Sequence, residues 1–268
     1  MKACRFIGTV AASLCFLFFV SSAYSQDHTQ NRPPHPTPPV SSHPSGDEKL
    51  LLDAANRERL AEGLQALKWD NALAAAASQH AQVMVSQNLL LHQCLDELPL
   101  DQRAARAGAK FSLIAENIAV GPNPESIHNG WMHSTGHRKN ILNADVTAVG
   151  IATIRGSGGL FAVQDFSRPV EELNLEQQED RVISLLKSNG LQIADVSGDA
   201  RKTCRMERGL DGTPALFVMR FEVTDLNKLP EGLLEKVKSR AYRKAAVGAC
   251  HAANIGSFTR YRIAVLLN

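Results

Sequence analysis

One segment at the start of the chain is dominated by apolar residues. Two basic residues precede a mostly apolar run over residues 6–20, and small residues follow at Ala23 and Ser25. This order is typical of a signal peptide, so we predict that residues 1–25 are removed by cleavage after Ser25. The alternatives are an uncleaved membrane anchor, for which the run is short, and a lipoprotein anchor at Cys15, whose preceding residues do not fit the usual pattern.

Residues 26–46 have the opposite character, because they are polar and rich in proline, serine and histidine. Such a segment buries too little apolar surface to offset the entropy of ordering it, so we predict a disordered or polyproline linker. We interpret its three histidines as polar linker residues without a specific role rather than as metal ligands.

Helical periodicity begins after this linker. Residues 47–62 carry apolar side chains at helical spacing, and Gly63 ends the pattern. Residues 71–87 form a second, alanine-rich pattern, with Asp70 in the position of a helix N-cap. His80 lies on the apolar stripe of this second helix, so we interpret it as a hydrogen-bonded core residue rather than as a ligand.

Shorter elements come next. We predict a short helix within residues 98–110 and a strand over residues 111–121. Asn123 then stands as an N-cap and Pro124 as the first residue of another helix. We expect this helix to end near Gly136, because glycine adopts the left-handed conformation that closes many helices.

A β-hairpin completes the first part of the chain. Residues 145–155 and 159–168 are rich in β-forming residues and are separated by a glycine-rich turn. The pattern therefore predicts a first domain, residues 47–169, that mixes helices with an antiparallel sheet.

Residues 170–268 follow a new pattern and are predicted to form a separate small α+β domain. Its expected elements are a helix, a strand, a second helix and a closing strand, at residues 171–190, 214–226, 230–250 and 259–268. We interpret the basic side chains of the second helix as a solvated face; these are Lys236, Lys238, Arg240, Arg243 and Lys244.

Composition narrows the function classes. Hydrophobic residues make up 44% and charged residues 21% of the 268 residues, which is typical of a soluble globular protein. The net charge is only +2 and aromatic residues are 6%, so neither an electrostatic nor a base-stacking surface for nucleic acid is indicated. We expect no nucleic-acid partner and no transmembrane segment after signal cleavage.

The cysteines indicate one disulfide. Two of the five cysteines lie in the predicted signal peptide. An exported protein keeps disulfides, and three remaining cysteines leave one unpaired. Because Cys204 and Cys250 lie in the same C-terminal region, we predict that they pair and that Cys94 is free.

Three residues carry the candidate chemistry. His92 lies in "LLLHQC", Glu116 in "AENIAVG" and His137 in "GWMHSTGHRKNIL". Two imidazoles can bind Zn²⁺ through nitrogen while water completes the coordination, and a carboxylate can ligate, orient a histidine or act as a base. The alternative is a hydrogen-bonded polar cluster without a metal.

The amino-acid sequences of these segments identify a protein family more specifically than the spacing of the three residues does. Residues 50–168 resemble the CAP superfamily of cysteine-rich secretory, antigen 5 and pathogenesis-related proteins, and its bacterial SCP-like branch in particular. The matching pieces come in family order: "NRERLAEGLQALKWDNALAAAASQHAQVM", a histidine, "AENIAVG", "GWMHSTGHRKNIL", "VGIA" and "AVQDFS".

The resemblance implies an α-β-α sandwich whose central cleft carries two histidines and two glutamates. His92 and His137 are similar to the two cleft histidines and are the metal-ligand candidates, and Glu116 is similar to the first glutamate. Ser134 stands where eukaryotic members have the second glutamate, which puts a four-ligand site in doubt.

We expect a secreted or envelope-associated binding module whose cleft residues (His92, Glu116, Ser134 and His137) hold a small ligand such as a lipid, sterol, glycan or peptide. The candidate cofactor is a weakly bound divalent metal such as zinc, and the alternative is no cofactor. One alternative is a metal-assisted hydrolase with Glu116 as general base. Another is an extracellular structural protein that docks through residues 170–268.

Overall fold

The structure is a computed structural model that describes residues 43–44, 46–195, 197–212, 214–252 and 257–268. The predicted signal peptide and most of the predicted linker lie outside these residues. Within the described part of the chain, no helix is both long and apolar enough to cross a bilayer.

The first sheet has the strand order β1-β3-β4-β2. Its strands are β1 (Lys68–Trp69), β3 (Ala148–Gly156), β4 (Gly159–Pro169) and β2 (Phe111–Gly121). β3 and β4 form the predicted hairpin, and β2 pairs antiparallel with β4. The sequence did not predict β1, which pairs parallel with β3 over two residues.

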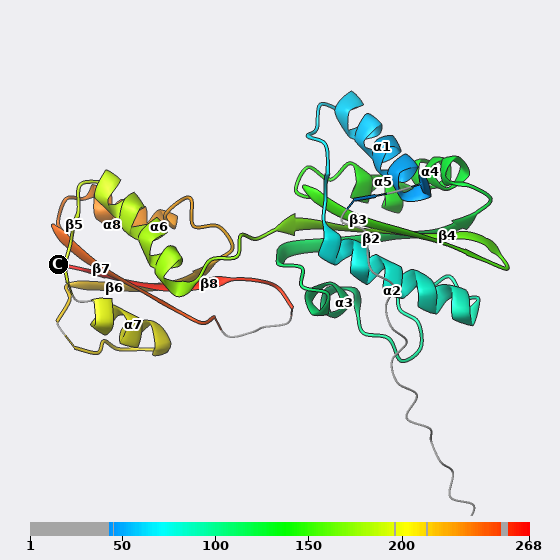
Figure 1. Cartoon of the computed structure of the whole chain (residues 1–268). Coiled ribbons are helices and arrows are strands. Elements are labelled where there is room, and N and C mark those ends of the chain that lie inside the picture. The colour runs from blue at the N-terminus through cyan, green and yellow to red at the C-terminus, as the bar shows by residue number, and fades with distance from the viewer. Residues whose placement is uncertain (1–42, 45, 196, 213, 253–256) are drawn as a thin grey trace, which may run out of the picture. The chain divides into compact units, whose positions relative to one another are not determined.

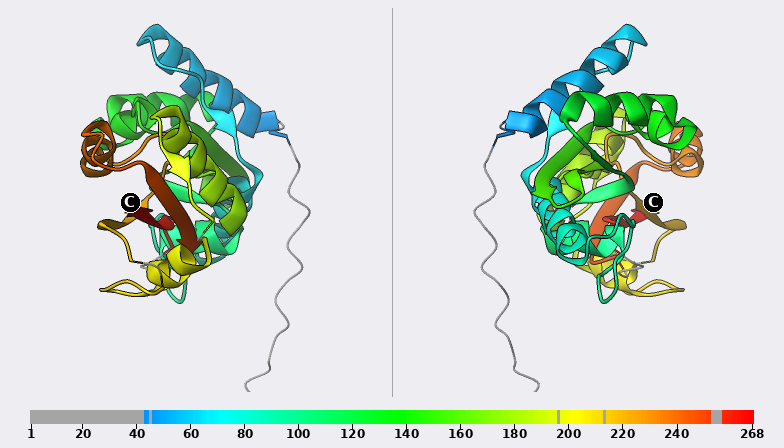
Figure 2. Two further views of the ribbon diagram at one scale, coloured as in Figure 1. Left: turned by 90° about the vertical axis from the view of Figure 1, so that its left-hand side faces the viewer. Right: turned by 90° about the vertical axis from the view of Figure 1, so that its right-hand side faces the viewer.

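Helices cover both faces of this sheet (Figure 1). On one face lie α1 (Gly46–Ala61), α4 (Pro124–His133) and α5 (Thr135–Ile141); on the other lie α2 (Asn71–Gln87) and α3 (Leu100–Arg106). The views of Figure 2, turned by 90°, show the same covering. The predicted α-β-α sandwich is confirmed.

Local signals explain the helix boundaries. The Asp70 carboxylate accepts hydrogen bonds from the backbone N–H groups of Ala72 and Leu73, at 2.8 and 3.0 Å, and so caps α2. The Asn123 side chain caps α4 in the same way, with Pro124 as the first helical residue.

The expected helix end at Gly136 is wrong. The helix breaks two residues earlier, at Ser134, whose backbone is extended with φ −96° and ψ 121°. The carbonyl of Ser134 then accepts the N–H of Arg138 at 2.9 Å, so a new helix, α5, starts at once. Gly136 lies inside α5, and this break sets the direction of α5.

The second sheet has the strand order β5-β7-β8-β6. Its strands are β5 (Gln192–Ile193), β7 (Lys244–Cys250), β8 (Tyr261–Leu267) and β6 (Phe217–Val223). Its helices are α6 (Leu175–Ser188), α7 (Ser197–Arg205) and α8 (Glu231–Lys238), with α6 and α8 on one face and α7 on the other (Figure 1). The expectation of a small α+β unit in the C-terminal part is confirmed.

The predicted helix over residues 230–250 is wrong. α8 ends at Lys238, Arg240 adopts a left-handed φ of +57°, and Lys244–Cys250 is the strand β7. Pairing with β8 buries the small apolar residues of β7, and this tertiary contact overrides their helix propensity. The predicted basic residues therefore do not share one helix face, although all five are exposed as predicted.

The two sheets share one topology. In each, a two-residue strand pairs parallel with the first strand of a hairpin, and the hairpin's second strand pairs with the remaining edge strand. Gly150 on β3 contacts the backbone of α2, where an added Cβ would lie 2.0 Å from the nitrogen of Ala74. Gly248 on β7 contacts the backbone of α7 in the same way. The second unit is therefore a smaller version of the first fold.

The predicted disulfide is confirmed, because Cys204 on α7 is bonded to Cys250 on β7. It joins the short helix α7 to the sheet from within a buried apolar cluster. Cys94 is a free, buried thiol, as predicted.

Candidate functional site

The candidate site lies along β2, the edge strand of the first sheet. Successive side chains of a strand point to opposite faces. Glu116 accordingly contacts residues on the α2 face, and Asn117 contacts residues of α5 on the other face. The edge of β2 therefore lies between the loop that carries His92 and the helix that carries His137. We call His92, Glu116 and His137 the edge site.

Glu116 is buried and both of its carboxylate oxygens are engaged. Oε1 lies 2.8 Å from Nδ1 of His92, and Oε2 accepts a hydrogen bond from the guanidinium of Arg103. Arg103 also donates to the carbonyl of His92 at 3.0 Å, so one buried arginine holds both partners. The hydrogen bond that His92 donates to Glu116 raises the pKa of His92, and burial opposes this shift.

His137 reaches the site from the opposite side of the strand. Its backbone carbonyl accepts a hydrogen bond from the Asn117 side chain at 3.2 Å, and Asn140 donates to the carbonyl of Glu116 at 3.1 Å. These bonds attach the first turns of α5 to β2. Burial lowers the pKa of His137, and the charge of His92 lowers it further.

The sequence-predicted residues are not equally engaged. A hydrogen bond joins the side chains of His92 and Glu116, whereas His137 is attached to β2 through its backbone carbonyl. Ser134 is half-buried at the junction of α4 and α5, and its side chain does not cap α5. It shapes the site through the helix break rather than through a contact with the other predicted residues.

The sequence did not single out Asp165, which is completely buried on β4 directly opposite Glu116. Burial raises the pKa of Asp165 well above its usual range, and the Glu116 carboxylate raises it further. Among the described residues, neither carboxylate oxygen of Asp165 has a hydrogen-bond partner. An acid in the mostly apolar segment "GLFAVQDF" was the available signal.

A second buried group lies against Glu116 from the side of α2. His80 Nε2 is 3.8 Å from Oε2 of Glu116, and His80 Nδ1 is 2.8 Å from the carboxylate of Glu97. Arg103 lies between the two acids, with Nη1 3.5 Å from Glu97. His80 is a core histidine with a hydrogen bond, as the sequence indicated, but its charged partners were not foreseen.

This geometry bears on the chemistry of Glu116. A general base needs an oxygen that faces a water. Because His92 and Arg103 hold both oxygens, Glu116 is placed instead to orient His92. In metal sites a carboxylate on one ring nitrogen commonly fixes the other nitrogen for the ion. Glu116 therefore fixes the orientation of the His92 ring, and metal binding by His92 and His137 stays a prediction.

The loop that carries His92 is unusually apolar on its outer surface. Between α2 and α3, the leucine side chains are 37% to 77% exposed. We call residues 89–98 the leucine loop; its exposed leucines are Leu89, Leu90, Leu91, Leu95 and Leu98. They are half of the ten exposed large apolar side chains in the described part of the chain. The buried Cys94 anchors the loop from beneath.

The second sheet lacks the acidic pair. Aligning the two hairpins on Gly150 and Gly248 places Ala264 at the position of Asp165. The same register places Arg220, opposite Ala264 on β6, at the position of Glu116. The site chemistry is therefore confined to the first sheet.

The sequence of the first sheet and its helices matches a known protein family. Residues 52–166 match the model of CAP, the cysteine-rich secretory protein family. These residues form a CAP domain. The CAP domain contains the whole edge site and the whole leucine loop, and the expectation from the sequence resemblance is confirmed.

Bacterial relatives share this domain. YkwD of Bacillus subtilis (strain 168), an uncharacterized protein, is 35% identical over 122 residues, which is 45% of this chain and 47% of YkwD. YlbC, an uncharacterized membrane protein of the same strain, is 34% identical over 110 residues, which is 40% of this chain and 32% of YlbC. The chain thus spans less than half of either protein.

Among solved structures, an extracellular protein containing an SCP domain from Bacillus anthracis str. Ames is similar over 48% of this chain and 45% of that chain. Its sequence identity is 30% and the TM-score is 0.41.

Proposed function

We propose that the CAP domain is an extracytoplasmic binding module for an amphiphilic lipid. The apolar part of the ligand would lie on the leucine loop, and its polar head would lie at His92 and His137. The observation that carries this proposal is that His92 lies within a loop whose leucines face solvent.

The apolar half of the proposal rests on exposure. Single exposed leucines are common on protein surfaces, but a contiguous apolar patch marks a binding surface. Leu91 and Leu95 flank His92 in the sequence and are 47% and 77% exposed. Covering such a side chain contributes about 1–2 kcal/mol to binding. Two of them would therefore change affinity by about tenfold or more.

The polar half rests on the two imidazoles. The His92 side chain is 61% exposed, and Glu116 holds its Nδ1 while Nε2 remains for a ligand. His137 is half-buried nearby. Their positions suit a ligand head that accepts hydrogen bonds. A divalent cation such as Zn²⁺, held by His92 and His137, would supply positive charge for an anionic head.

The compartment is part of the same proposal. The predicted signal peptide directs export, and the Cys204–Cys250 disulfide is of the kind that persists outside the cytoplasm. We place residues 170–268 as a second domain after the CAP domain of residues 47–169, without the acidic pair of the site. Docking through residues 170–268 stays a prediction.

A titration with a fluorophore-labelled fatty acid tests the proposal. The variant Leu91→Gln/Leu95→Gln should weaken binding at least tenfold. Leu60→Gln is the matched control, because Leu60 is 61% exposed on α1, away from the leucine loop. Binding that falls equally in both variants, or in neither, would contradict a lipid site on the leucine loop.

A further inference from the structure

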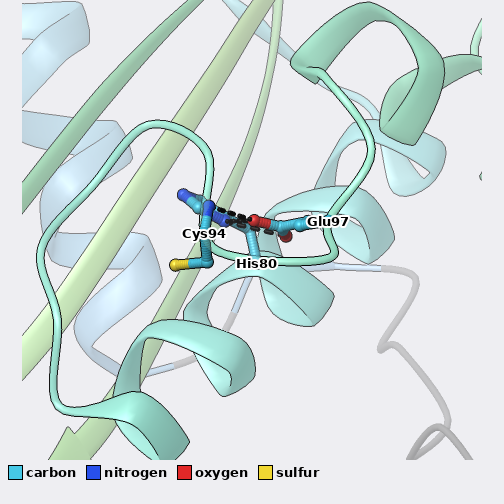
Figure 3. Close-up of side chains that lie close together, drawn as sticks. All are labelled: His80, Cys94 and Glu97. Atoms are coloured by element: carbon cyan, nitrogen blue, oxygen red, sulfur yellow. Dashed lines mark hydrogen bonds and ion pairs between the residues drawn. The ribbon is translucent and has the colours of Figure 1, made fainter. Parts of the chain in front are cut away.

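We propose that His80, Cys94 and Glu97 form a separate internal metal site for a zinc-type ion, beneath the leucine loop. One ligand atom of each residue lies within 4.8 Å of the others. His80 comes from α2, whereas Cys94 and Glu97 come from the loop between α2 and α3 (Figure 3). An ion at this point would join the loop to the helix on which it rests.

The ligand types select the class of ion. A thiolate, an imidazole and a carboxylate form a donor set that suits zinc better than calcium or magnesium. Zinc bonds of about 2.0–2.3 Å place tetrahedral donors roughly 3.3–3.6 Å apart. His80 Nδ1 and Glu97 are already 2.8 Å apart and need to separate slightly, whereas the Cys94 thiol, within 4.8 Å of the other donors, needs to approach them. Cys94 and Glu97 lie on a loop without regular structure, which permits that movement.

Both ring nitrogens of His80 have neighbours that suit a metal-binding histidine. Its Nδ1 lies 2.9 and 2.8 Å from the two oxygens of Glu97, so two electron-rich groups already share a proton there. On the other side, Nε2 faces Glu116 at 3.8 Å and has no hydrogen-bond partner in the described part of the chain. Metal binding at Nδ1 would move the ring proton to Nε2, where it faces Glu116, as in carboxylate–histidine–metal arrangements.

The surroundings of the site hold buried groups of both signs. Arg103 lies 3.5 Å from Glu97 and also binds Glu116, and His80 lies 2.8 Å from Glu97 and 3.8 Å from Glu116. A divalent ion that binds together with the Cys94 thiolate adds one positive charge beside the two acids, and the thiol proton leaves to solvent.

This site is independent of the proposed lipid function, because it shares no ligand with His92 or His137. The test uses the full chain, freed of metal by a chelator and kept under nitrogen so that Cys94 stays reduced. Co²⁺ is added as the probe, since thiolate ligation gives a charge-transfer absorption in the near ultraviolet. We expect one equivalent of Co²⁺ to produce this band and one equivalent of Zn²⁺ to remove it.

Substitutions identify which residues give rise to the Co²⁺ charge-transfer band. Cys94→Ser, a change of similar size, should abolish it, and Glu97→Gln should weaken binding at least tenfold. His137→Asn, in the edge site, should leave the band unchanged. A wild-type chain that binds Co²⁺ without a thiolate band overturns the proposal and does not depend on the folding of any variant. So does a band that persists in Cys94→Ser. Loss of lipid binding with an intact band would instead count against the lipid function alone.

Discussion

Glu116 on β2 and Asp165 on β4 lie directly opposite each other in the sheet, and both are buried. Two acids at this spacing do not both ionise at low cost, and the structure resolves the conflict by giving them different partners. Glu116 has His92 and Arg103. Asp165 has neither, and its pKa is raised.

The first prediction follows from this raised pKa. Below the ordinary carboxyl pKa of 3.8, both the folded and the unfolded chain hold the Asp165 proton. As the pH rises, the unfolded chain loses that proton first, so stability falls until the folded pKa is passed, by about 1.4 kcal/mol per unit of pKa difference. Asp165→Asn removes this loss. The variant should therefore be more stable than the wild type at pH 7, by a margin that shrinks toward pH 4.

Urea denaturation at several pH values measures that margin. Asp180→Asn, at an exposed position on α6, is the control and should show no comparable trend. A margin for Asp165→Asn that grows as the pH falls would show that Asp165 is ionised in the folded chain.

The second prediction concerns the orientation of His92. Glu116→Gln keeps the size of the side chain but removes the charge that holds Nδ1. Loss of such a partner typically reduces metal affinity by about 10- to 100-fold. Calorimetry with Zn²⁺ in a Cys94→Ser background isolates the edge site. Glu125→Gln, at an exposed position on α4, is the control. Equal affinities for the two variants would remove Glu116 from the site.

The third prediction concerns the close approach of helices to both sheets. Gly150→Ala places a Cβ against the backbone of α2, and Gly248→Ala does the same against α7. Each substitution should cost about 3 kcal/mol or more, because backbone rather than a flexible side chain must move. Gly130→Ala, which meets nothing within 4 Å on α4, should be neutral or stabilising. Thermal melts compare all three, and a harmless Gly248→Ala would contradict the shared topology.

The fourth prediction concerns Arg59, which is almost fully buried. Its guanidinium donates to four backbone carbonyls, those of Gln65, Ile141, Asn143 and Val146. Arg59→Met leaves these carbonyls without their donor and should destabilise the chain by about 3–5 kcal/mol. Arg57→Met, at an exposed position two residues earlier on α1, should change stability by less than about 0.5 kcal/mol. Denaturant midpoints measure both, and similar midpoints would contradict the role of Arg59.

Sequence patterns predicted the elements whose signals are local. Asp70, Asn123 and Pro124 start helices because their contacts span only a few residues. The hairpin of β3 and β4 followed from its turn, and the disulfide from the proximity of two cysteines in one region.

The features that the sequence did not predict depend on distant partners. β7 is a strand because β8 lies beside it, which no pattern within residues 230–250 reveals. Likewise, His92 and Glu116 were candidates from the sequence, whereas Arg103 and Asp165 join them only through the pairing of β2 with β4 and the packing of α3. The shared topology of the two sheets has no obvious sequence repeat behind it.

One measurement tests the binding proposal most directly. The ring resonances of His92 and His137 and the amide resonances of residues 89–98 are followed by NMR while decanoate is added to the ¹⁵N-labelled chain. We predict that these resonances shift together and saturate, while those of residues 170–268 stay in place. Shifts confined to residues 170–268, or no saturable shift at His92 and His137, would contradict a lipid-binding site at the edge of β2.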